Sequence, residues 1–161
     1  AKTLRNRNYE IRFDTAFDAV MAACAPPRED GAGTWITARM RDAYDRLHRL
    51  GYAHSVETWI DGALAGGLYG VAIGAAFFGE SMFSVARDAS KMALVALVRR
   101  CEAEGIRLID CQMHTPHLAS LGARDMPRTQ FSHRLAELID LEHGGNGRPP
   151  GPWTAAYTNT P

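Results

Sequence analysis

The sequence has 161 residues, enough for one domain with its own hydrophobic core, and its length gives no reason to expect two domains. Apolar residues make up 46% of the chain and charged residues 22%, which is typical of a globular protein and excludes a highly charged disordered chain. The sequence contains no apolar run of membrane length. The formal net charge is zero, so overall charge argues neither for nor against a nucleic-acid partner. No signal-peptide pattern is found, and we expect a cytoplasmic protein.

Local charge is concentrated at the start of the chain. In residues 1–12, Arg5, Arg7 and two further cations stand against Glu10 alone. This basic arm is either solvated or contacts phosphate groups, and the sequence leaves both interpretations open.

The cysteines and histidines form no recognisable metal site. The three cysteines cannot all pair with one another, none has C-x-x-C spacing, and the six histidines do not cluster with them. We therefore expect reduced thiols and no bound metal. Because side chains alternate across a strand, Cys111 should point away from Asp110 and Gln112, and we expect it to be a core thiol.

Two helices are predicted in the first third of the chain. Asp14 is placed to cap a helix that runs to Cys24 and ends at Pro26-Pro27. Thr37 is placed to cap a second helix that Gly51 closes. The apolar face of this second helix consists of Met40, Ala43, Tyr44, Leu47 and Leu50.

Strands are predicted from Ala53 onward. Residues 55–60 alternate, Asp61-Gly62 forms a two-residue hairpin turn, and residues 63–73 return as the partner strand. A third strand carries residues 77–84. The second strand contains three glycines, Gly66, Gly67 and Gly70. Glycines inside a strand indicate a bulge, a close approach by another group, or tight packing of a helix on the sheet.

The remaining chain predicts a helix, a strand and a helix. The helix begins at Asp88 or Ser90 and ends at Gly105, and residues 106–113 follow as a short buried strand. The last helix is amphipathic. The tail of residues 144–161 is rich in Gly and Pro, and we expect it to cover the surface with Trp153 as an anchor.

This order of elements predicts an α/β domain over residues 13–143, flanked by the arm of residues 1–12 and the tail of residues 144–161. It has three layers, a central and mostly antiparallel sheet, and a strand–helix–strand crossover between the third and fourth strands. It is the order expected of an N-acetyltransferase-like domain (GNAT-type, also called acyl-CoA N-acyltransferase-type).

One glutamate is out of place in this pattern. Glu80 lies in the apolar run of residues 77–84, where burying an unpaired charge would cost several kcal/mol or more. We expect Glu80 either to be less buried than the run suggests or to meet a cationic group.

A second polar pair points to acyl transfer. If residues 106–113 are one strand, Asp110 and Gln112 share a face, where they could orient an amine and hydrogen-bond a tetrahedral intermediate. Nearby apolar residues such as Leu68, Phe77 and Met82 would suit a hydrophobic side chain. The alternative is that Asp110 and Gln112 only cap loops or pair with surface arginines.

A conventional acyl-coenzyme A transferase is the competing hypothesis. That class cradles a pyrophosphate on a Gly-rich turn between the third strand and the following helix. Residues 84–91 contain no glycine, and Asp88 would repel a phosphate there. We therefore expect no coenzyme A.

From Tyr9 to about Trp153 the chain closely resembles the bacterial leucyl/phenylalanyl-tRNA–protein transferase family. The matching stretches are Thr34-Trp35-Ile36-Thr37, Ala43-Tyr44 with Leu47-His48, Ala53-His54-Ser55-Val56-Glu57, Gly66-Gly67-Leu68-Tyr69-Gly70, Phe78-Gly79-Glu80-Ser81-Met82-Phe83-Ser84, Ala89-Ser90-Lys91, Asp110-Cys111-Gln112 and Ser120-Leu121-Gly122-Ala123.

The resemblance implies a GNAT-type catalytic domain that uses aminoacyl-tRNA in place of acyl-coenzyme A. The family moves Leu or Phe, and Met less well, to the α-amino group of proteins that begin with Arg or Lys, which marks those proteins for degradation. Aminoacyl-tRNA and such proteins are thus the implied partners. We expect no cofactor, no membrane partner and a monomer.

Site residues are implied by matching positions. Asp110 and Gln112 match the proposed catalytic pair, which would activate the attacking amine and stabilise the transition state. Glu80 matches the site glutamate, whose charge suits a basic N-terminal residue or the amino group of the esterified amino acid. Arg5 and Arg7 are the implied tRNA phosphate contacts. The positions implied to bind the aminoacyl-adenosine are Trp35, Tyr44, Leu68, Phe77, Met82, Ser84 and Ile109.

The chain also departs from the family pattern. Family members usually carry a smaller N-terminal domain ahead of this region, which contributes to tRNA binding. Val85 stands where an arginine is usual, and residues 124–126 replace a commoner small-Glu-Ile sequence. Two alternatives therefore stay open, namely a shortened relative that binds basic N-termini or tRNA ends without transfer, and an enzyme that acylates a small-molecule amine.

Overall fold

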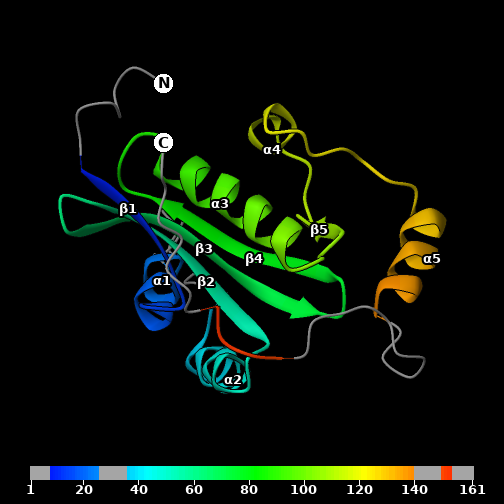
Figure 1. Cartoon of the computed structure of the whole chain (residues 1–161), viewed down its shortest axis with the longest axis horizontal. Helices are drawn as coiled ribbons and strands as arrows, with labels where there is room; N and C mark the ends of the chain where they lie inside the picture. The colour runs from blue at the N-terminus through cyan, green and yellow to red at the C-terminus, as the bar shows by residue number, and fades with distance from the viewer. Residues whose placement is uncertain (1–7, 26–35, 140–149, 154–161) are drawn as a thin grey trace.

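A five-stranded sheet forms the centre of the computed structural model, which describes residues 8–25, 36–139 and 150–153 (Figure 1). In chain order the elements are β1 (Tyr9–Phe13), α1 (Phe17–Ala23), α2 (Ala38–Arg49), β2 (Ala53–Ile60), β3 (Ala63–Ile73), β4 (Ala76–Ser84), α3 (Ala89–Ala103), β5 (Leu108–Asp110), α4 (Pro116–Ser120) and α5 (Arg128–Ile139).

The strands lie in the order in which they follow one another along the chain. β1 to β4 are antiparallel neighbours, and β5 runs parallel to β4 after a crossover through α3. The hairpin turn between β2 and β3 has positive φ at both Asp61 (51°) and Gly62 (79°), as a two-residue primed turn requires. The predicted sheet, hairpin and crossover are therefore confirmed.

Helices cover both faces of the sheet, which gives three layers (Figure 1). α3 packs on one face through Ala93, Ala96 and Leu97, against Leu68 and Phe77 of the sheet. On the opposite face α1 and α2 pack against β3, where Tyr69 and Val71 are buried. Near the start of β4, α5 is anchored by Leu138. The predicted α/β three-layer arrangement is confirmed.

The glycines of β3 serve two of the purposes that the sequence left open, tight packing of a helix and a bulge. A Cβ on Gly66 would lie 2.6 Å from the Cβ of Ala89, so the absence of a side chain lets α3 approach the sheet. The pairing of β3 with β4 shifts between Tyr69 and Gly70, where Gly70 pairs with Gly79 and Tyr69 with Ser81. This shift is a β-bulge.

The structure corrects the prediction at the N-terminal side. Residues 9–12, assigned above to the basic arm, are part of the edge strand β1, and the alternation of Tyr9, Ile11 and Phe13 with charged residues was its signal. Asp14 does not cap α1. Its φ is 56°, and the residue before the helix is Ala16, which makes no side-chain cap.

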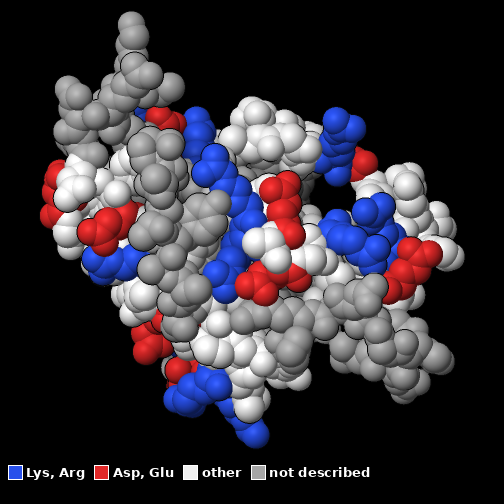
Figure 2. Space-filling view, viewed as in Figure 1, with Lys and Arg blue, Asp and Glu red and all other residues white. Residues whose placement is uncertain are grey.

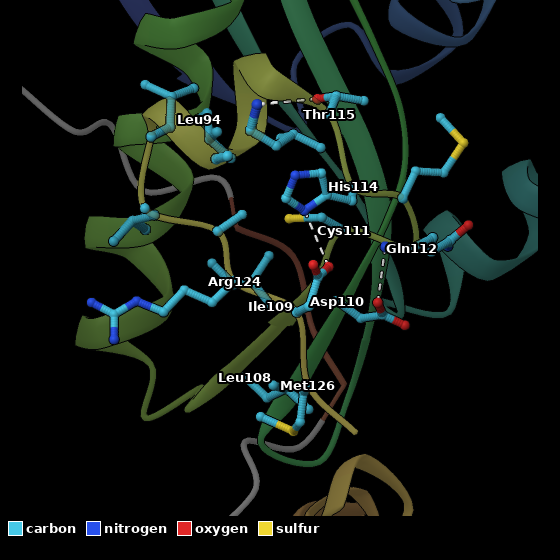
Figure 3. A pocket seen from close by; sticks show the side chains of 18 of the residues that line it. Leu94, Leu108, Ile109, Asp110, Cys111, Gln112, His114, Thr115, Arg124 and Met126 are labelled. Atoms are coloured by element: carbon cyan, nitrogen blue, oxygen red, sulfur yellow. Dashed lines mark hydrogen bonds and ion pairs between the residues drawn. The ribbon is translucent and has the colours of Figure 1, made fainter. Parts of the chain in front are cut away.

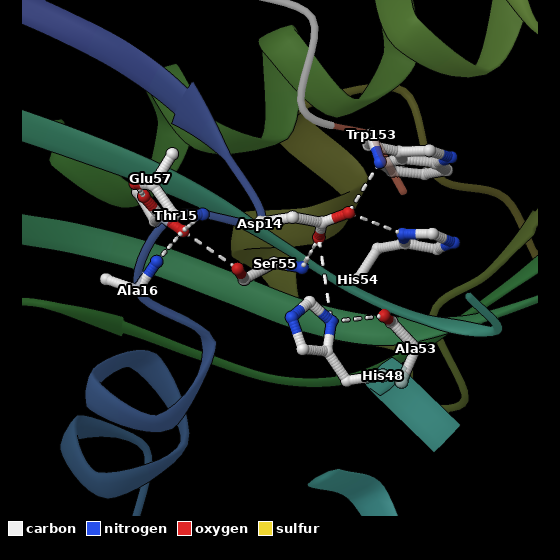
Figure 4. A network of polar contacts seen from close by, with 9 residues as sticks. All are labelled: Asp14, Thr15, Ala16, His48, Ala53, His54, Ser55, Glu57 and Trp153. Atoms are coloured by element: carbon white, nitrogen blue, oxygen red, sulfur yellow. Dashed lines mark hydrogen bonds and ion pairs between the residues drawn. The ribbon is translucent and has the colours of Figure 1, made fainter. Parts of the chain in front are cut away.

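A buried carboxylate holds the start of α1 in place of a cap (Figure 4). Glu57 on β2 is 0% exposed and accepts hydrogen bonds from the amides of Thr15 (2.9 Å) and Ala16 (2.8 Å). The hydroxyl of Ser55 donates to it at 2.8 Å, and the hydroxyl of Thr15 donates as well. A buried charge needs such partners, and here all of those described are uncharged donors.

Asp14 anchors a second part of the network shown in Figure 4. It accepts hydrogen bonds from the amide of Ser55 and from Nδ1 of His54, both at 2.9 Å, and from the amide of Trp153 at 2.7 Å. Burial alone would raise the pKa of Asp14, but these hydrogen bonds and the charge of His54 bring it below its ordinary value. The indole of Trp153 is fully buried, so the predicted anchor is part of the core.

Candidate functional site

Glu80 is the extra residue of the β-bulge in β4. Gly79 and Ser81 have partners in β3, whereas Glu80, between them, has none. A bulge changes the direction in which a side chain points. Glu80 is half-buried and faces α2, where its carboxylate accepts a hydrogen bond from the hydroxyl of Tyr44. Among the described residues, Glu80 thus meets a neutral donor, the Tyr44 hydroxyl.

The hydroxyls of Tyr44 and Tyr69 lie near Glu80, and the thiol of Cys24 lies near Tyr69. Burial, followed by the charge of Glu80, raises the pKa of Tyr44. Burial also raises the pKa of Tyr69, and the neighbouring Tyr44, Cys24 and Glu80 add to this effect. The rings of Tyr44 and Tyr69 meet edge to face at 5.4 Å. The Tyr69 hydroxyl is buried and finds no hydrogen-bond partner in the part of the chain that the structure describes.

Asp110 and Gln112 lie together, but the prediction that they share a strand face is wrong. β5 ends at Asp110, and Gln112 follows with φ at 60°. The Asp110 carboxylate accepts a hydrogen bond from the Gln112 amide at 2.9 Å, which closes a turn (Figure 3). This turn ends the strand early, because the aspartate side chain replaces a strand partner for the Gln112 N–H.

Asp110 and Glu80 lie on the same face of neighbouring strands. Phe78 pairs with Asp110 in β5 and with Val71 in β3, and Val71 packs on the α1–α2 face. Paired residues point to the same side of a sheet, so Asp110 also faces that side. Glu80 reaches the same side through its contact with Tyr44 of α2. The two carboxylates therefore face one side of the sheet, two residues apart in register.

The predicted apolar residues gather on the opposite face. Leu68 and Phe77 are buried in the core beneath α3, and Met82 and Ile109 pack against this core while remaining half-buried. Leu94 of α3 joins them, although the sequence did not single it out. The predicted site is therefore divided between the two faces of the sheet.

The early end of β5 leaves the sheet open between these two faces. β5 pairs only with residues 76–78 of β4, so the edge of β4 from Gly79 onward has no strand beside it in the described chain. Glu80 and Met82 belong to this unpaired edge, while Asp110 and Ile109 stand at the end of β5. The polar and apolar groups thus border one opening in the sheet.

A groove of about 950 Å³ begins at the end of β5 and continues between α3, α4 and the start of α5 (Figure 3). Ile109, Asp110 and Gln112 line it together with Leu94 of α3. Tyr44, Glu80 and Met82 are outside its lining. Cys111 is half-buried and lines the groove, so the prediction of a core thiol is wrong, although burial does raise its pKa.

Other predicted site residues lie elsewhere or outside the described chain. Ser84 is at the far end of β4, where its hydroxyl donates to the carbonyl of Ala86 at 2.8 Å and accepts from the amide of Ser90 at 3.2 Å. Trp35, Arg5 and Arg7 are outside the described residues.

The N-terminus of α3 carries an anion. Asp88 precedes the helix with φ at 64° and forms an ion pair with Lys91 at 3.0 Å. A hydrogen bond from Lys91 lowers the pKa of Asp88. Among the described residues no group of three or more His, Cys, Asp or Glu is placed to hold a metal ion. No helix in the described ranges is long and apolar enough to cross a membrane.

Sequence reasoning missed the segment after β5. Residues 113–126 form much of the groove wall, including α4, which begins at Pro116 with Thr115 as its cap. The Thr-Pro pair before a short apolar run was a signal for this helix.

Comparison with known sequences identifies one family. A family model described as leucyl/phenylalanyl-tRNA protein transferase matches residues 1–136. The chain is 62% identical over 154 residues to the leucyl/phenylalanyl-tRNA–protein transferase of Thiobacillus denitrificans, with 96% of this chain and 65% of the relative covered. It is 66% identical over 140 residues to that of Nitrosomonas europaea, with 87% and 59% covered. The chain thus spans between 59% and 65% of the length of these two curated relatives.

Solved structures of acetyltransferases share the fold. The ribosomal-protein-alanine N-acetyltransferase of Brucella melitensis biovar Abortus 2308 superimposes with a TM-score of 0.56 at 13% identity, over 74% of this chain and 92% of that one. An aminoglycoside N-acetyltransferase in complex with CoA gives 0.54 at 15% identity, over 77% and 93%. At such identity the likeness concerns the fold alone, and it confirms the predicted GNAT-type arrangement.

Proposed function

Because this chain belongs to the leucyl/phenylalanyl-tRNA–protein transferase family, we propose that it transfers Leu or Phe, and Met less well, from aminoacyl-tRNA to the α-amino group of proteins that begin with Arg or Lys. The product would carry a destabilising N-terminal residue and be directed to degradation. The reaction would take place in the cytoplasm with the chain as a monomer.

The placement of Asp110 and Glu80 carries this proposal. Both carboxylates face the same side of the sheet, at the point where β5 ends and β4 continues alone. A cationic N-terminal residue and its amine need negative groups nearby, and Asp110 is suited to accept a proton from the attacking amine. Glu80 would bind the basic side chain or the amino group of the esterified amino acid, with Tyr44 holding it in position.

Gln112 would stabilise the charge that develops on the carbonyl oxygen. Its main-chain N–H is already bonded to Asp110, so the side-chain amide is the group left to donate. Gln112 is exposed at the groove, where a substrate can reach it. An amide donor that is held against the developing oxyanion typically contributes about 10²–10³ in rate.

The apolar residues on the α3 face would receive the side chain of the transferred amino acid. Leu68 and Phe77 form a closed floor, and Met82, Ile109 and Leu94 are the partly exposed residues above it. Methionine adapts to ligands of different shape, which suits acceptance of both a branched and an aromatic side chain. The aromatic ring of Tyr44 would stack on the terminal adenosine, together with Trp35.

We propose that aminoacyl-tRNA is the acyl donor and that coenzyme A is not used. The loop from β4 to α3 contains no glycine, and Asp88 places a negative charge at the helix N-terminus, where a phosphate would otherwise bind. An aminoacyl ester is already activated, so positioning and electrostatics suffice without a covalent nucleophile.

The test uses radiolabelled Leu-tRNA, Phe-tRNA and Met-tRNA with an Arg-starting and an Ala-starting peptide. We expect label on the Arg-starting peptide only, with Leu and Phe ahead of Met. Label on both peptides would disprove the role of the N-terminal cation, and binding without any transfer would favour the non-catalytic alternative. Transfer to a small amine in preference to either peptide would favour the third hypothesis.

Two variants test the assigned chemistry. Asp110→Asn keeps an oxygen that can accept from the Gln112 amide but cannot take a proton. We expect a loss of at least about 100-fold in kcat, as for a general base. Ser120→Ala, on exposed α4, is the control and should keep the full rate.

A further inference from the structure

We propose that the groove between α3, β5 and α4 binds the residues of the acceptor polypeptide that follow its N-terminal residue, and that apolar side chains at those positions strengthen binding. The proposal rests on the proposed function, because it takes Asp110 as the point where the acceptor amine reacts.

Exposed apolar side chains are concentrated at this groove. Seven large hydrophobic residues are exposed in the described chain, and two of them, Leu50 and Val85, lie away from it. The other five line it, and they are Val95, Val98, Met113, Leu121 and Met126. Exposed apolar residues gathered in one hollow mark a ligand-binding surface, whereas scattered ones do not.

The groove is continuous with the proposed reaction centre. Asp110 and Gln112 line one end of it, and Leu121 and Met126 line the wall beyond α4. The α-amine of the acceptor is attached to a polypeptide, which in extended form advances about 3.3 Å per residue. Its next residues must therefore leave Asp110 along some surface, and the groove is a surface that starts there.

The charges of the groove favour a polypeptide over RNA. Its lining contains three arginines, Arg99, Arg124 and Arg128, and three carboxylates, on Glu102, Asp110 and Asp125. Figure 2 shows cationic and anionic side chains interspersed on this face. A phosphate backbone needs an excess of positive charge, which this lining does not have. Apolar side chains of a peptide bind without an excess of positive charge.

The experiment compares two Arg-starting peptides that carry a fluorophore at the C-terminus. In one peptide the four residues after Arg are Leu and Val, and in the other they are Gly and Ser. The full chain, the double variant Leu121→Ser/Met126→Ser and the control Leu50→Ser/Val85→Ser are each tested. Fluorescence anisotropy gives the peptide Kd, and transfer from Leu-tRNA gives KM and kcat.

We expect the groove variant to raise both Kd and KM about tenfold for the apolar peptide and less than twofold for the Gly/Ser peptide. The kcat and the KM for Leu-tRNA should stay unchanged, and the control should behave as the parent chain. Equal effects on the two peptides, or no effect on either, would overturn the proposal. So would a raised KM for Leu-tRNA with unchanged peptide binding, which would assign the groove to RNA.

Peptide binding separates this proposal from the proposed function. If no variant and no parent chain transferred label, but the apolar peptide still bound in a way that depended on Leu121 and Met126, the groove assignment would stand and the transfer reaction would not. If transfer proceeded with no preference for apolar residues, the transfer reaction would stand and the groove assignment would not.

Discussion

The main-chain amide of Trp153 donates a 2.7 Å hydrogen bond to Oδ2 of Asp14, and so joins residues 139 positions apart. The indole stacks on the ring of His54 with centroids 4.0 Å apart and lies against Phe77 at 5.7 Å. The segment that contains Trp153 therefore completes the core beneath α3.

Replacing this indole should destabilise the whole domain. We expect Trp153→Ala to lower the free energy of unfolding by about 3–5 kcal/mol, because a fully buried aromatic side chain leaves a cavity. Leu50→Ala, at a residue that is 56% exposed, should change it by less than about 0.5 kcal/mol. Urea unfolding followed by circular dichroism measures both. Equal stability of the two variants would show that the segment does not hold the core.

Asp14 should make stability depend on acidity. Its pKa in the folded chain lies below the ordinary value of 3.8, because hydrogen bonds outweigh burial. A lowered pKa means that the carboxylate stabilises the fold at neutral pH and loses this effect as the pH falls through the folded-state value. Asp14→Asn should cost about 1–3 kcal/mol at pH 7, through lost acceptors for buried donors.

The difference between the parent chain and Asp14→Asn should shrink as the pH falls below about 4. Urea unfolding at pH 7, 5, 4 and 3 measures it. A difference that stayed constant over this range would mean that the charge of Asp14 does not contribute.

The order of β2 to β5, the hairpin and the three layers were predictable because each depends on local pattern. Residues 55–60 alternate, Asp61-Gly62 is a strong turn sequence, and Thr37 accepts from the Met40 amide as a helix cap should. The positions that carry the proposed chemistry, Glu80 and Asp110, were also found from sequence, because charges in apolar runs are costly and therefore conspicuous.

The remaining features depend on particular side-chain hydrogen bonds rather than on the periodicity of the sequence. Asp14 looked like a helix cap, but it is bound by His54 and Trp153, which no local pattern can reveal. The strand that was predicted to continue to Met113 stops at Asp110, because the carboxylate accepts a hydrogen bond from the amide two residues on. Helix and strand propensities describe the regular backbone pattern of a segment. Both outcomes were decided instead by particular side-chain hydrogen bonds that compete with this pattern.

The β-bulge that carries Glu80 depends on the absence of a Cβ at Gly70. A Cβ on Gly70 would lie 2.5 Å from Cζ of Phe77 and closer still to the carbonyl of Phe78. We expect Gly70→Ala to cost about 1–3 kcal/mol through overpacking and to lower the transfer rate by displacing Glu80. Gly79→Ala is the matched control, because its Cβ would find its nearest neighbour at 3.4 Å. If both variants were equally stable and active, the bulge would not require Gly70.

The hydroxyl of Tyr44 contacts Glu80, and its ring is proposed to stack on adenosine. Two variants separate these two contributions. Tyr44→Phe removes the donor to Glu80 but keeps the ring that meets Tyr69 at 5.4 Å. We expect kcat/KM for transfer to fall about ten- to a hundredfold, since a hydrogen bond to a charged group contributes about 1.5–3 kcal/mol. Tyr44→Ala also removes the surface for stacking on adenosine, which contributes about 1–3 kcal/mol per base. It should therefore raise the KM for Leu-tRNA, which Tyr44→Phe leaves unchanged.

Steady-state kinetics with Leu-tRNA measure both, and Tyr52→Phe is the control. A raised KM for Leu-tRNA in Tyr44→Phe would mean that the hydroxyl, rather than the ring, contacts the RNA.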